Sequence, residues 1–175
     1  MKEQNTQNEN GQRQGAFRPQ LALYHPNGRG TGAAAKFELH PAHDNVAGCI
    51  MLKIAAQCAI GSKAGDTPQF ARFDWENAIT VKLDFSDISA MLQVFNGESE
   101  SLGDGRGLYH LSAKAATKIA MRHVVEPKPG YSLNLHRTTT ADNAETRTHM
   151  LVTPTEAEGL RAAILGAMSA ICFGA

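Results

Sequence analysis

Three basic residues recur at every fourth position in one stretch of the chain. Lys114, Lys118 and Arg122 share one parity, whereas apolar residues such as Ile119 and Met121 occupy the other. Alternate side chains of a β-strand face opposite sides of a sheet, so this spacing predicts a basic, solvent-facing sheet surface. Such a surface neutralises phosphates and releases counterions. The same spacing also fits one face of a helix, and the simplest interpretation is a solvated face that keeps a strand soluble.

A charged and aromatic cluster at Arg72, Phe73 and Trp75 precedes a segment of alternating apolar residues. Aromatic rings stack on unpaired bases, worth roughly 1–3 kcal/mol per base, which gives affinity for single strands without a large net charge. The alternative is that Phe73 and Trp75 are core anchors. The hairpin residues Tyr131 and His136 are further stacking candidates. The complete predicted nucleic-acid-binding set is Lys53, Arg72, Phe73, Trp75, Lys82, Lys114, Lys118, Arg122, Tyr131 and His136.

A metal-dependent enzyme is a less favoured interpretation. His40, His43 and Asp44 place two imidazoles and a carboxylate close together in the sequence, as a metal site requires. Pro41 lies between the histidines, however, and no strand or helix is predicted to fix their geometry. Four other histidines recur at even spacing without accompanying ligands, which we interpret as coincidence. They are His110, His123, His136 and His149.

The sequence contains no nucleophile elbow, phosphate-binding loop or dinucleotide-binding fingerprint. The glycine-rich segment 103–107 does not fit these templates and is predicted to be a hairpin loop. We therefore predict a protein that is not an enzyme, with no catalytic residues, no metal and no cofactor.

The composition is that of a globular protein without net charge. Of 175 residues, 42% are hydrophobic, and 17 Lys and Arg balance 17 Asp and Glu. Any nucleic-acid binding must therefore come from a local patch. No apolar run approaches the roughly 20 residues of a membrane-spanning helix, and no secretory signal is found, which predicts a cytoplasmic protein without a membrane partner. Cys49, Cys58 and Cys172 form no Cys-x-x-Cys motif and are predicted to be small buried hydrophobes.

The pattern of apolar runs divides the chain into a tail and one domain. Residues 1–20 are rich in Asn, Gln, Gly and Glu and are predicted to be a disordered polar tail. Residues 21–175 form the single predicted domain, with about eight strands, one short inserted helix and one terminal helix, an α+β fold. Segment 61–68 is predicted to be a loop. Residues 113–125 and 131–140 are predicted to form a hairpin.

Capping residues mark both predicted helices. Ser86 is expected to cap the short inserted helix, which ends at Gly97. In the terminal helix, Thr153 is the predicted N-cap, Pro154 occupies the first helical position and Glu156 completes a capping box. Small residues on this helix permit another helix to approach closely, which predicts an oligomer. These small residues are Ala163, Gly166, Ala167 and Ala170.

Several short strings share their order and spacing with a known family. They are Gly32 to Pro41, Gly48 to Ala55, Phe73 to Trp75, Phe85 to Ile88, Glu98 to Ser101 and Val152 to Glu158. In this respect the chain resembles the Whirly family of single-stranded DNA-binding proteins of plant organelles, whose Tyr-Asp-Trp corresponds to Phe73-Asp74-Trp75. The resemblance covers residues 32–174.

The resemblance implies a Whirly-like fold of two roughly perpendicular four-stranded antiparallel sheets, whose helices pack the subunits into a homotetramer. Nucleic acid would lie along the sheets and between neighbouring subunits. Kinetoplastid mitochondrial guide-RNA-binding proteins share the fold, so RNA stays an alternative to DNA. Thr31 and Ala33 stand where the family has lysines, which leaves assembly beyond a tetramer open, and Gly174-Ala175 replaces a Gly-Trp. A short polar tail in place of a transit peptide favours a bacterial or phage origin.

The favoured hypothesis is a sequence-tolerant binder of single-stranded DNA or RNA that acts in replication, recombination or repair. The alternative is a structural or protein-interaction scaffold of the same fold that does not bind nucleic acid. The zero net charge favours the scaffold, whereas the basic stripe and the aromatic cluster favour the binder.

Overall fold

A computed structural model describes residues 19–64 and 67–174. Of the predicted disordered tail, residues 1–18 lie outside the described residues. Gln20, assigned to that tail from the sequence, is instead the first residue of a strand and pairs with Glu38. Leu21 and Leu23 of the same strand pack against the hydrophobic core, which holds the strand in place from its first residues.

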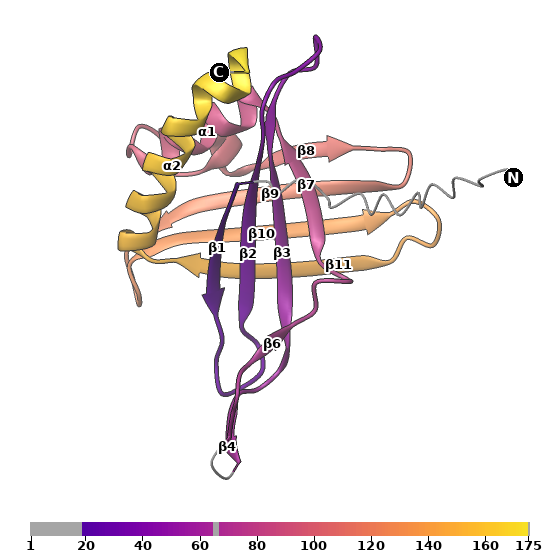
Figure 1. The fold of residues 1–175 in the computed structure, drawn as a ribbon, viewed down its shortest axis with the longest axis vertical. Coiled ribbons are helices and arrows are strands. Elements are labelled where there is room, and N and C mark those ends of the chain that lie inside the picture. Colours follow the sequence, from indigo (N-terminus) through magenta and orange to yellow (C-terminus); the bar gives the residue numbers. More distant parts are fainter. Residues whose placement is uncertain (1–18, 65–66, 175) are drawn as a thin grey trace, which may run out of the picture.

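The first sheet is antiparallel and runs vertically in Figure 1. Its members are β1 (Gln20–His25), β2 (Ala33–His40), β3 (Cys49–Ala59), β6 (Arg72–Phe73) and β7 (Ile79–Leu83). Strands β1, β2 and β3 are adjacent in that order, and β7 pairs with the first half of β3. The short β6 pairs with the end of β3, so the sheet has one strand more than the four expected.

The second sheet contains the predicted hairpin and the basic stretch. Its strands are β8 (Leu108–Leu111), β9 (Ala115–Val124), β10 (Gly130–Thr139) and β11 (Glu145–Val152), in the antiparallel order β11-β10-β9-β8. The register places Met121 opposite Leu133 and Ile119 opposite Leu135, which confirms the hairpin. Because β9 is a strand, the helical alternative for the basic stretch is wrong.

The two sheets stack face to face with their strands roughly perpendicular, as Figure 1 shows. Side chains of both inner faces are removed from water and form one continuous core, which is the main favourable term in folding. Leu52 and Ile54 of the first sheet and Ile119, Leu133 and Leu135 of the second are among its fully buried members.

Two helices close one end of this sandwich (Figure 1). Helix α1 (Phe85–Phe95) contacts β7 and β9, and helix α2 (Pro154–Phe173) contacts β2, β10 and α1. The capping box of Thr153 and Glu156 with Pro154 in the first turn is confirmed. The cap of α1 is Asp84 rather than Ser86, because the Asp84 carboxylate accepts the Asp87 N–H while the Asp87 side chain accepts the Asp84 N–H.

Two segments predicted to be simple loops have structure of their own. Residues 61–68 include β4 (Ser62–Ala64), which pairs with β5 (Thr67–Gln69) in a small hairpin that extends beyond the first sheet in Figure 1. The glycine-rich segment 103–107 does not join two paired strands as predicted. It overlaps a 3₁₀ turn, η1 (Leu102–Gly105), that precedes β8.

The cysteines correct another prediction, since Cys49 alone is buried and Cys58 and Cys172 are exposed. Both exposed cysteines lie near element ends, where the periodicity that predicts burial is weakest. Within residues 19–64 and 67–174, no helix has the length and apolar character needed to cross a membrane.

A buried amide ties the first hairpin to β3. The Gln57 side-chain oxygen accepts the N–H of Asn27 at 2.9 Å and of Gly32 at 3.2 Å, while its NH₂ donates to the carbonyl oxygens of Asn27 at 3.0 Å and Ala59 at 3.1 Å. Gly32 is required for this approach, because a Cβ there would lie 2.2 Å from the His25 carbonyl oxygen. Gln57 therefore holds the β1–β2 turn in place.

We expect Gln57→Leu to lower the free energy of unfolding by about 3 kcal/mol, because several buried backbone groups lose their partners at once. Chemical denaturation measures the change. Gln93→Leu is the matched control, since Gln93 is exposed on α1, and it should change stability by less than about 0.5 kcal/mol. Equal stability of the two variants would contradict the role assigned to Gln57.

Candidate nucleic-acid interface

Each sheet has an inner face toward the core and an outer face directed away from it. On β2, Ala35 and Phe37 belong to the core, so Lys36 between them faces outward. On β3, Leu52 and Ile54 are core residues and Lys53 faces outward by the same parity. We call this side of β1, β2, β3 and β7 the first-sheet outer face, and the corresponding side of β8 to β11 the second-sheet outer face.

Three lysines converge on the first-sheet outer face. Lys36 and Lys53 are directly opposite each other on β2 and β3, and Lys82 on β7 lies diagonally beyond Lys53. Like charges directly opposite each other across a sheet are destabilising. Among the ion pairs of the described residues, none relieves this repulsion with an acidic partner. An anionic ligand would relieve it, so this lysine triad is a candidate site for phosphates.

An aromatic cluster lies beside the lysine triad. The ring centroids of Tyr24 and Phe73 are 5.7 Å apart, and those of Tyr24 and Trp75 are 6.4 Å apart in an edge-to-face arrangement. The Lys36 ammonium lies 4.4 Å from the centre of the Trp75 ring, a cation–π contact. Tyr24 is 52% exposed, and Phe73 and Trp75 are half-buried outside the core. The cluster therefore offers aromatic surface to solvent.

The turn after β6 fixes Trp75 in this cluster. The Asp74 N–H donates to the Ala56 carbonyl oxygen at 2.9 Å, which anchors the turn to β3. Asn77 donates its side-chain NH₂ to Asp74 Oδ2 at 2.8 Å and its backbone N–H to Asp74 Oδ1 at 3.1 Å. These hydrogen bonds lower the pKa of Asp74, so its carboxylate stays ionised and committed to the turn.

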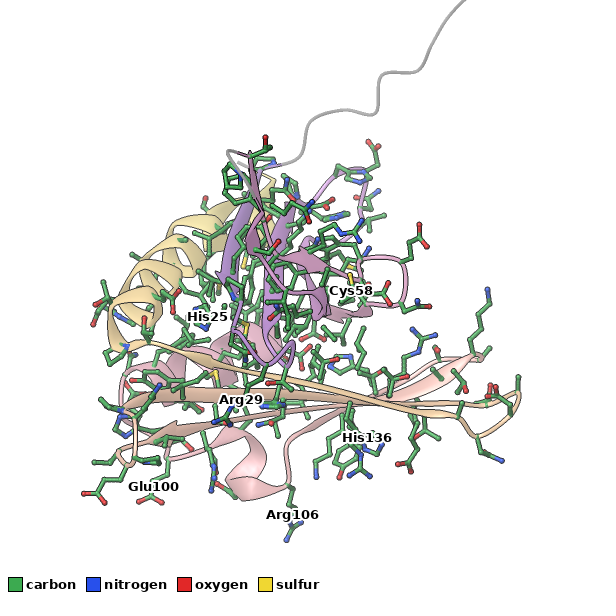
Figure 2. The ribbon with its side chains drawn as sticks, turned by 90° about the horizontal axis from the view of Figure 1, so that it is seen from below. His25, Arg29, Cys58, Glu100, Arg106 and His136 are labelled. Atoms are coloured by element: carbon green, nitrogen blue, oxygen red, sulfur yellow. The ribbon has the colours of Figure 1, made fainter. Side chains whose placement is uncertain are left out.

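A second row of aromatic and basic side chains crosses the second-sheet outer face. The register aligns Tyr109, Lys118, His136 and Arg147 on four adjacent strands. The Lys118 ammonium lies 5.2 Å from the centre of the Tyr109 ring, and Tyr109 is 64% exposed. Figure 2 shows His136 on the side of this sheet away from the first sheet. Arg147 is partly neutralised by Glu145, which accepts its N–H at 2.9 Å.

The structure divides the predicted set between these two surfaces. It brings Phe73, Trp75, Lys53 and Lys82 together on the first-sheet outer face, with the exposed Arg72 adjacent on β6. Lys118, Arg122 and His136 share the second-sheet outer face. Lys114 lies in the turn before β9, where its carbonyl oxygen accepts the Thr140 N–H at 2.9 Å. The basic stripe is thus two strand residues and one turn residue.

Tyr131 lies apart from both surfaces. Its ring packs on the core side of the second sheet, 5.0 Å from the Phe95 ring, and its hydroxyl donates to the Phe95 carbonyl oxygen at 3.3 Å. This position makes Tyr131 a link between β10 and α1, so it does not join the surface residues predicted with it.

Sequence reasoning missed four residues of these surfaces, namely Tyr24, Lys36, Tyr109 and Arg147. Lys36 alternates with apolar residues in β2, but the run of alanines before it conceals the parity. Tyr24 shares the parity of Ala22 in β1, opposite to the half-buried leucines, and this was the available signal. Tyr109 lies on a four-residue strand, too short for its alternation to be recognised.

The histidines do not converge on a metal centre. Within residues 19–64 and 67–174, no group of three or more His, Cys, Asp or Glu side chains is arranged to hold a metal ion. His40 contacts Glu38 at 2.9 Å and His43 contacts Asp44 at 3.4 Å, so the two imidazoles of the predicted candidate site have separate carboxylate partners.

Comparison with known proteins identifies the fold. No protein-family model and no curated protein sequence matches the chain. Among solved structures, WHY1 from Arabidopsis thaliana is 16% identical over 90% of this chain and 87% of its own, with a TM-score of 0.68. The plant transcriptional regulator PBF-2 is 16% identical over 89% and 82%, with a TM-score of 0.67. A guideRNA-binding protein complex bound to a gRNA is 17% identical over 89% and 93%, with a TM-score of 0.57.

The chain therefore has the Whirly-like α+β fold, with two stacked antiparallel sheets, a short helix and a C-terminal helix. The expected fold class is confirmed. At this level of identity the comparison defines the architecture, and the chemistry of this chain has to be argued from its own residues.

Proposed function

We propose that this protein binds single-stranded nucleic acid on the outer faces of its sheets and is not an enzyme. One observation carries the proposal. Lys36 and Lys53 oppose each other without an acidic partner among the described residues, directly beside the exposed ring of Tyr24 and the half-buried ring of Trp75. This arrangement costs stability in the free protein and suits a ligand that supplies phosphates and flat bases together.

The pairing of rings with cations favours a single strand over a duplex. In a duplex the flat faces of the bases are stacked on each other, so a protein ring reaches them only in an unpaired strand. The lysine triad would neutralise phosphates without regard to base, which makes the binding sequence-tolerant. The guideRNA-binding complex of the same fold, bound to a gRNA, supports nucleic-acid binding at the level of the fold.

The ligand is DNA or RNA, and a role in replication, recombination or repair is the working assignment from the sequence. PBF-2 is described as a transcriptional regulator, so proteins of this fold serve more than one pathway. The protein-interaction scaffold stays the second candidate, because 17 basic residues are balanced by 17 acidic ones and long-range attraction to nucleic acid is absent.

The first experiment compares labelled single-stranded DNA, single-stranded RNA and duplex DNA by fluorescence anisotropy at low and high salt. We expect both single strands to bind more tightly than the duplex, with affinity that falls as salt rises, because phosphate contacts release counterions. Equal affinity for duplex and single strands would remove the stacking component of the proposal. No binding at low salt would favour the scaffold.

The protein is further proposed to act as a homo-oligomer, most simply a homotetramer. Helix α2 turns one apolar stripe to the core and leaves other apolar side chains in solvent. Leu165 is 48% and Phe173 is 83% exposed, and the small residues Ala163 and Gly166 are exposed as well. The two outer faces of one subunit point away from each other (Figure 2). A single nucleic-acid strand that contacts both kinds of face would therefore pass from one subunit to the next.

We expect light scattering to give the mass of a tetramer at micromolar concentration. Leu165→Lys should dissociate it, because a charge would be buried at the helix interface. Glu158→Lys is the control for a charge change on the same helix at an exposed position. A monomeric wild-type protein would remove the oligomer from the proposal and leave binding by a single subunit.

A further inference from the structure

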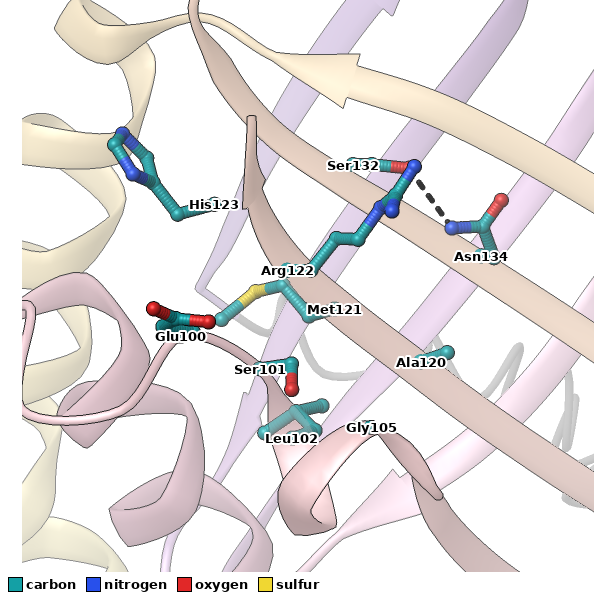
Figure 3. Close-up of a pocket in the computed structure, with 10 residues that line it drawn as sticks. All are labelled: Glu100, Ser101, Leu102, Gly105, Ala120, Met121, Arg122, His123, Ser132 and Asn134. Carbon is teal, nitrogen blue, oxygen red and sulfur yellow. Dashed lines mark hydrogen bonds between the residues drawn. The ribbon is translucent and has the colours of Figure 1, made fainter. Parts of the chain in front are cut away.

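The glycine-rich turn builds a polar hollow on the second-sheet outer face. A hollow of about 590 Å³ lies between this turn and the strands β9 and β10, within the usual range of ligand pockets. Its floor includes Ala120 and its turn side includes Gly105, two positions that place no large side chain in the hollow. Figure 3 shows Glu100 on the turn side and Arg122 extending toward Ser132 and Asn134 on β10.

The turn side of this hollow is held in place by hydrogen bonds. Ser101 forms an antiparallel bridge with Arg122, and the His123 N–H donates to the Glu100 carbonyl oxygen at 3.0 Å. Leu102 is only 1% exposed and anchors the segment in the core. Gly107 passes so close to β9 that a Cβ would lie 2.5 Å from the Ile119 carbonyl oxygen. The segment therefore continues the edge of the sheet along β9 beyond Leu108, where β8 begins.

Two opposite charges border the hollow without neutralising each other. Within residues 19–64 and 67–174, neither the Glu100 carboxylate nor the Arg122 guanidinium takes part in an ion pair. The Asn134 NH₂ donates to Ser132 Oγ at 2.9 Å, and both residues line the hollow on the β10 side. The hollow thus presents hydrogen-bond acceptors and a strong donor to one ligand.

We propose that this hollow is a guanine-selective pocket, bordered by the Glu100 carboxylate and the Arg122 guanidinium. Guanine carries adjacent N1–H and N2–H donors, which a carboxylate accepts together, and the O6 and N7 acceptors to which arginine donates as a pair. Adenine presents a donor in place of O6, and thymine has neither the paired donors nor N7. Cytosine offers the carboxylate a single amino group. Guanine alone makes both two-point contacts.

This inference rests on the proposed single-strand binding and adds a preference for one base. A nucleic-acid strand held along the second-sheet outer face by Lys118 would bring its bases to the hollow, because the hollow adjoins β9, the β-strand that carries Lys118. A free guanine nucleotide has the same base chemistry, and the experiment separates the two sources.

The experiment measures binding of the full-length protein to a thymidine-only oligonucleotide and to the same strand with one central guanine, inosine, adenine or cytosine. We expect the guanine strand to bind about 10-fold more tightly than the thymidine-only strand, and inosine, which lacks N2, to fall between them. Glu100→Gln should abolish this ratio, since the amide NH₂ places a donor against guanine where the carboxylate has its second acceptor oxygen. Binding of guanosine monophosphate alone is titrated in parallel by calorimetry.

Glu98→Gln is the matched control, because Glu98 is an exposed acid two positions away that does not line the hollow. It removes the same charge and should keep the guanine ratio. A ratio lost only in Glu100→Gln supports recognition of a guanine within the strand. If the wild-type protein binds guanosine monophosphate, the Glu100→Gln variant does not, and no strand is preferred, the result supports a pocket for the free nucleotide. If the wild-type protein binds all strands tightly, without a guanine preference and without binding the free nucleotide, the pocket is overturned and the proposed function stays intact. If the wild-type protein binds none of the strands, the proposed function itself is removed.

Discussion

Replacing Lys36 and Lys53 together by glutamine should weaken single-strand binding roughly 10- to 100-fold at low salt. The slope of log affinity against log salt should become shallower by about 1.4, or about 0.7 per lost phosphate contact. The same variant should stay close to the wild type in stability, because the lost repulsion between the opposed ammonium groups offsets the lost contact of Lys36 with the Trp75 ring. Anisotropy titrations over a range of salt concentrations and thermal melting give the two quantities on one preparation.

The control carries the same change of charge away from both outer faces. Arg29→Gln and Lys128→Gln lie in exposed turns, and together they should leave the salt slope nearly unchanged. Lys118→Gln with Arg122→Gln provides the comparison for the second-sheet outer face and should also reduce the slope. If the Lys36 and Lys53 variant folds normally and keeps both its affinity and its salt slope, the lysine triad is only a solvated surface. The main support for the proposed function is then lost.

Tyr24→Leu should weaken single-strand binding roughly 5- to 100-fold without changing the salt slope, because stacking on a base is worth roughly 1–3 kcal/mol and releases no counterions. Leucine keeps apolar cover over the sheet, and Tyr24 is already 52% exposed, so the melting temperature should stay close to that of the wild type. Affinity and melting are measured on the same samples, which separates a stacking role from a structural one.

Phe70→Leu is the aromatic control, since Phe70 is 82% exposed, follows β5 and is absent from the ring contacts of the described residues. It should leave binding unchanged. A Tyr24→Leu variant that melts much earlier than the wild type would show that the cluster is a structural cover, which was the alternative interpretation of these aromatic residues. Unchanged affinity with unchanged melting would show that bases do not reach Tyr24.

The local patterns of the sequence determined the elements of this protein. Alternation with a period of two predicted the strands that became β7 and β9, because every second side chain in each must enter the core. The capping box at Thr153 and Glu156 predicted the start of α2, because its hydrogen bonds join residues three apart. Gln20 was assigned wrongly because the start of β1 depends on its pairing with β2, whereas Ser86 was chosen over Asp84, whose capping box with Asp87 is itself local.

The sites depend on contacts that only the tertiary structure decided. Alternation shows that Lys36 and Lys53 face away from the core, but the register between β2 and β3 makes them opposite neighbours, and register is set by long-range packing. Tyr24 meets Trp75 because β1 and the turn after β6 are brought to the same face of the sheet. The glycine-rich segment has no periodicity of its own, and it becomes part of the wall of a pocket because the preceding Ser101 forms a bridge with Arg122 on β9. The sequence thus determined which side chains face outward, whereas the pairing of the strands decided which of them meet.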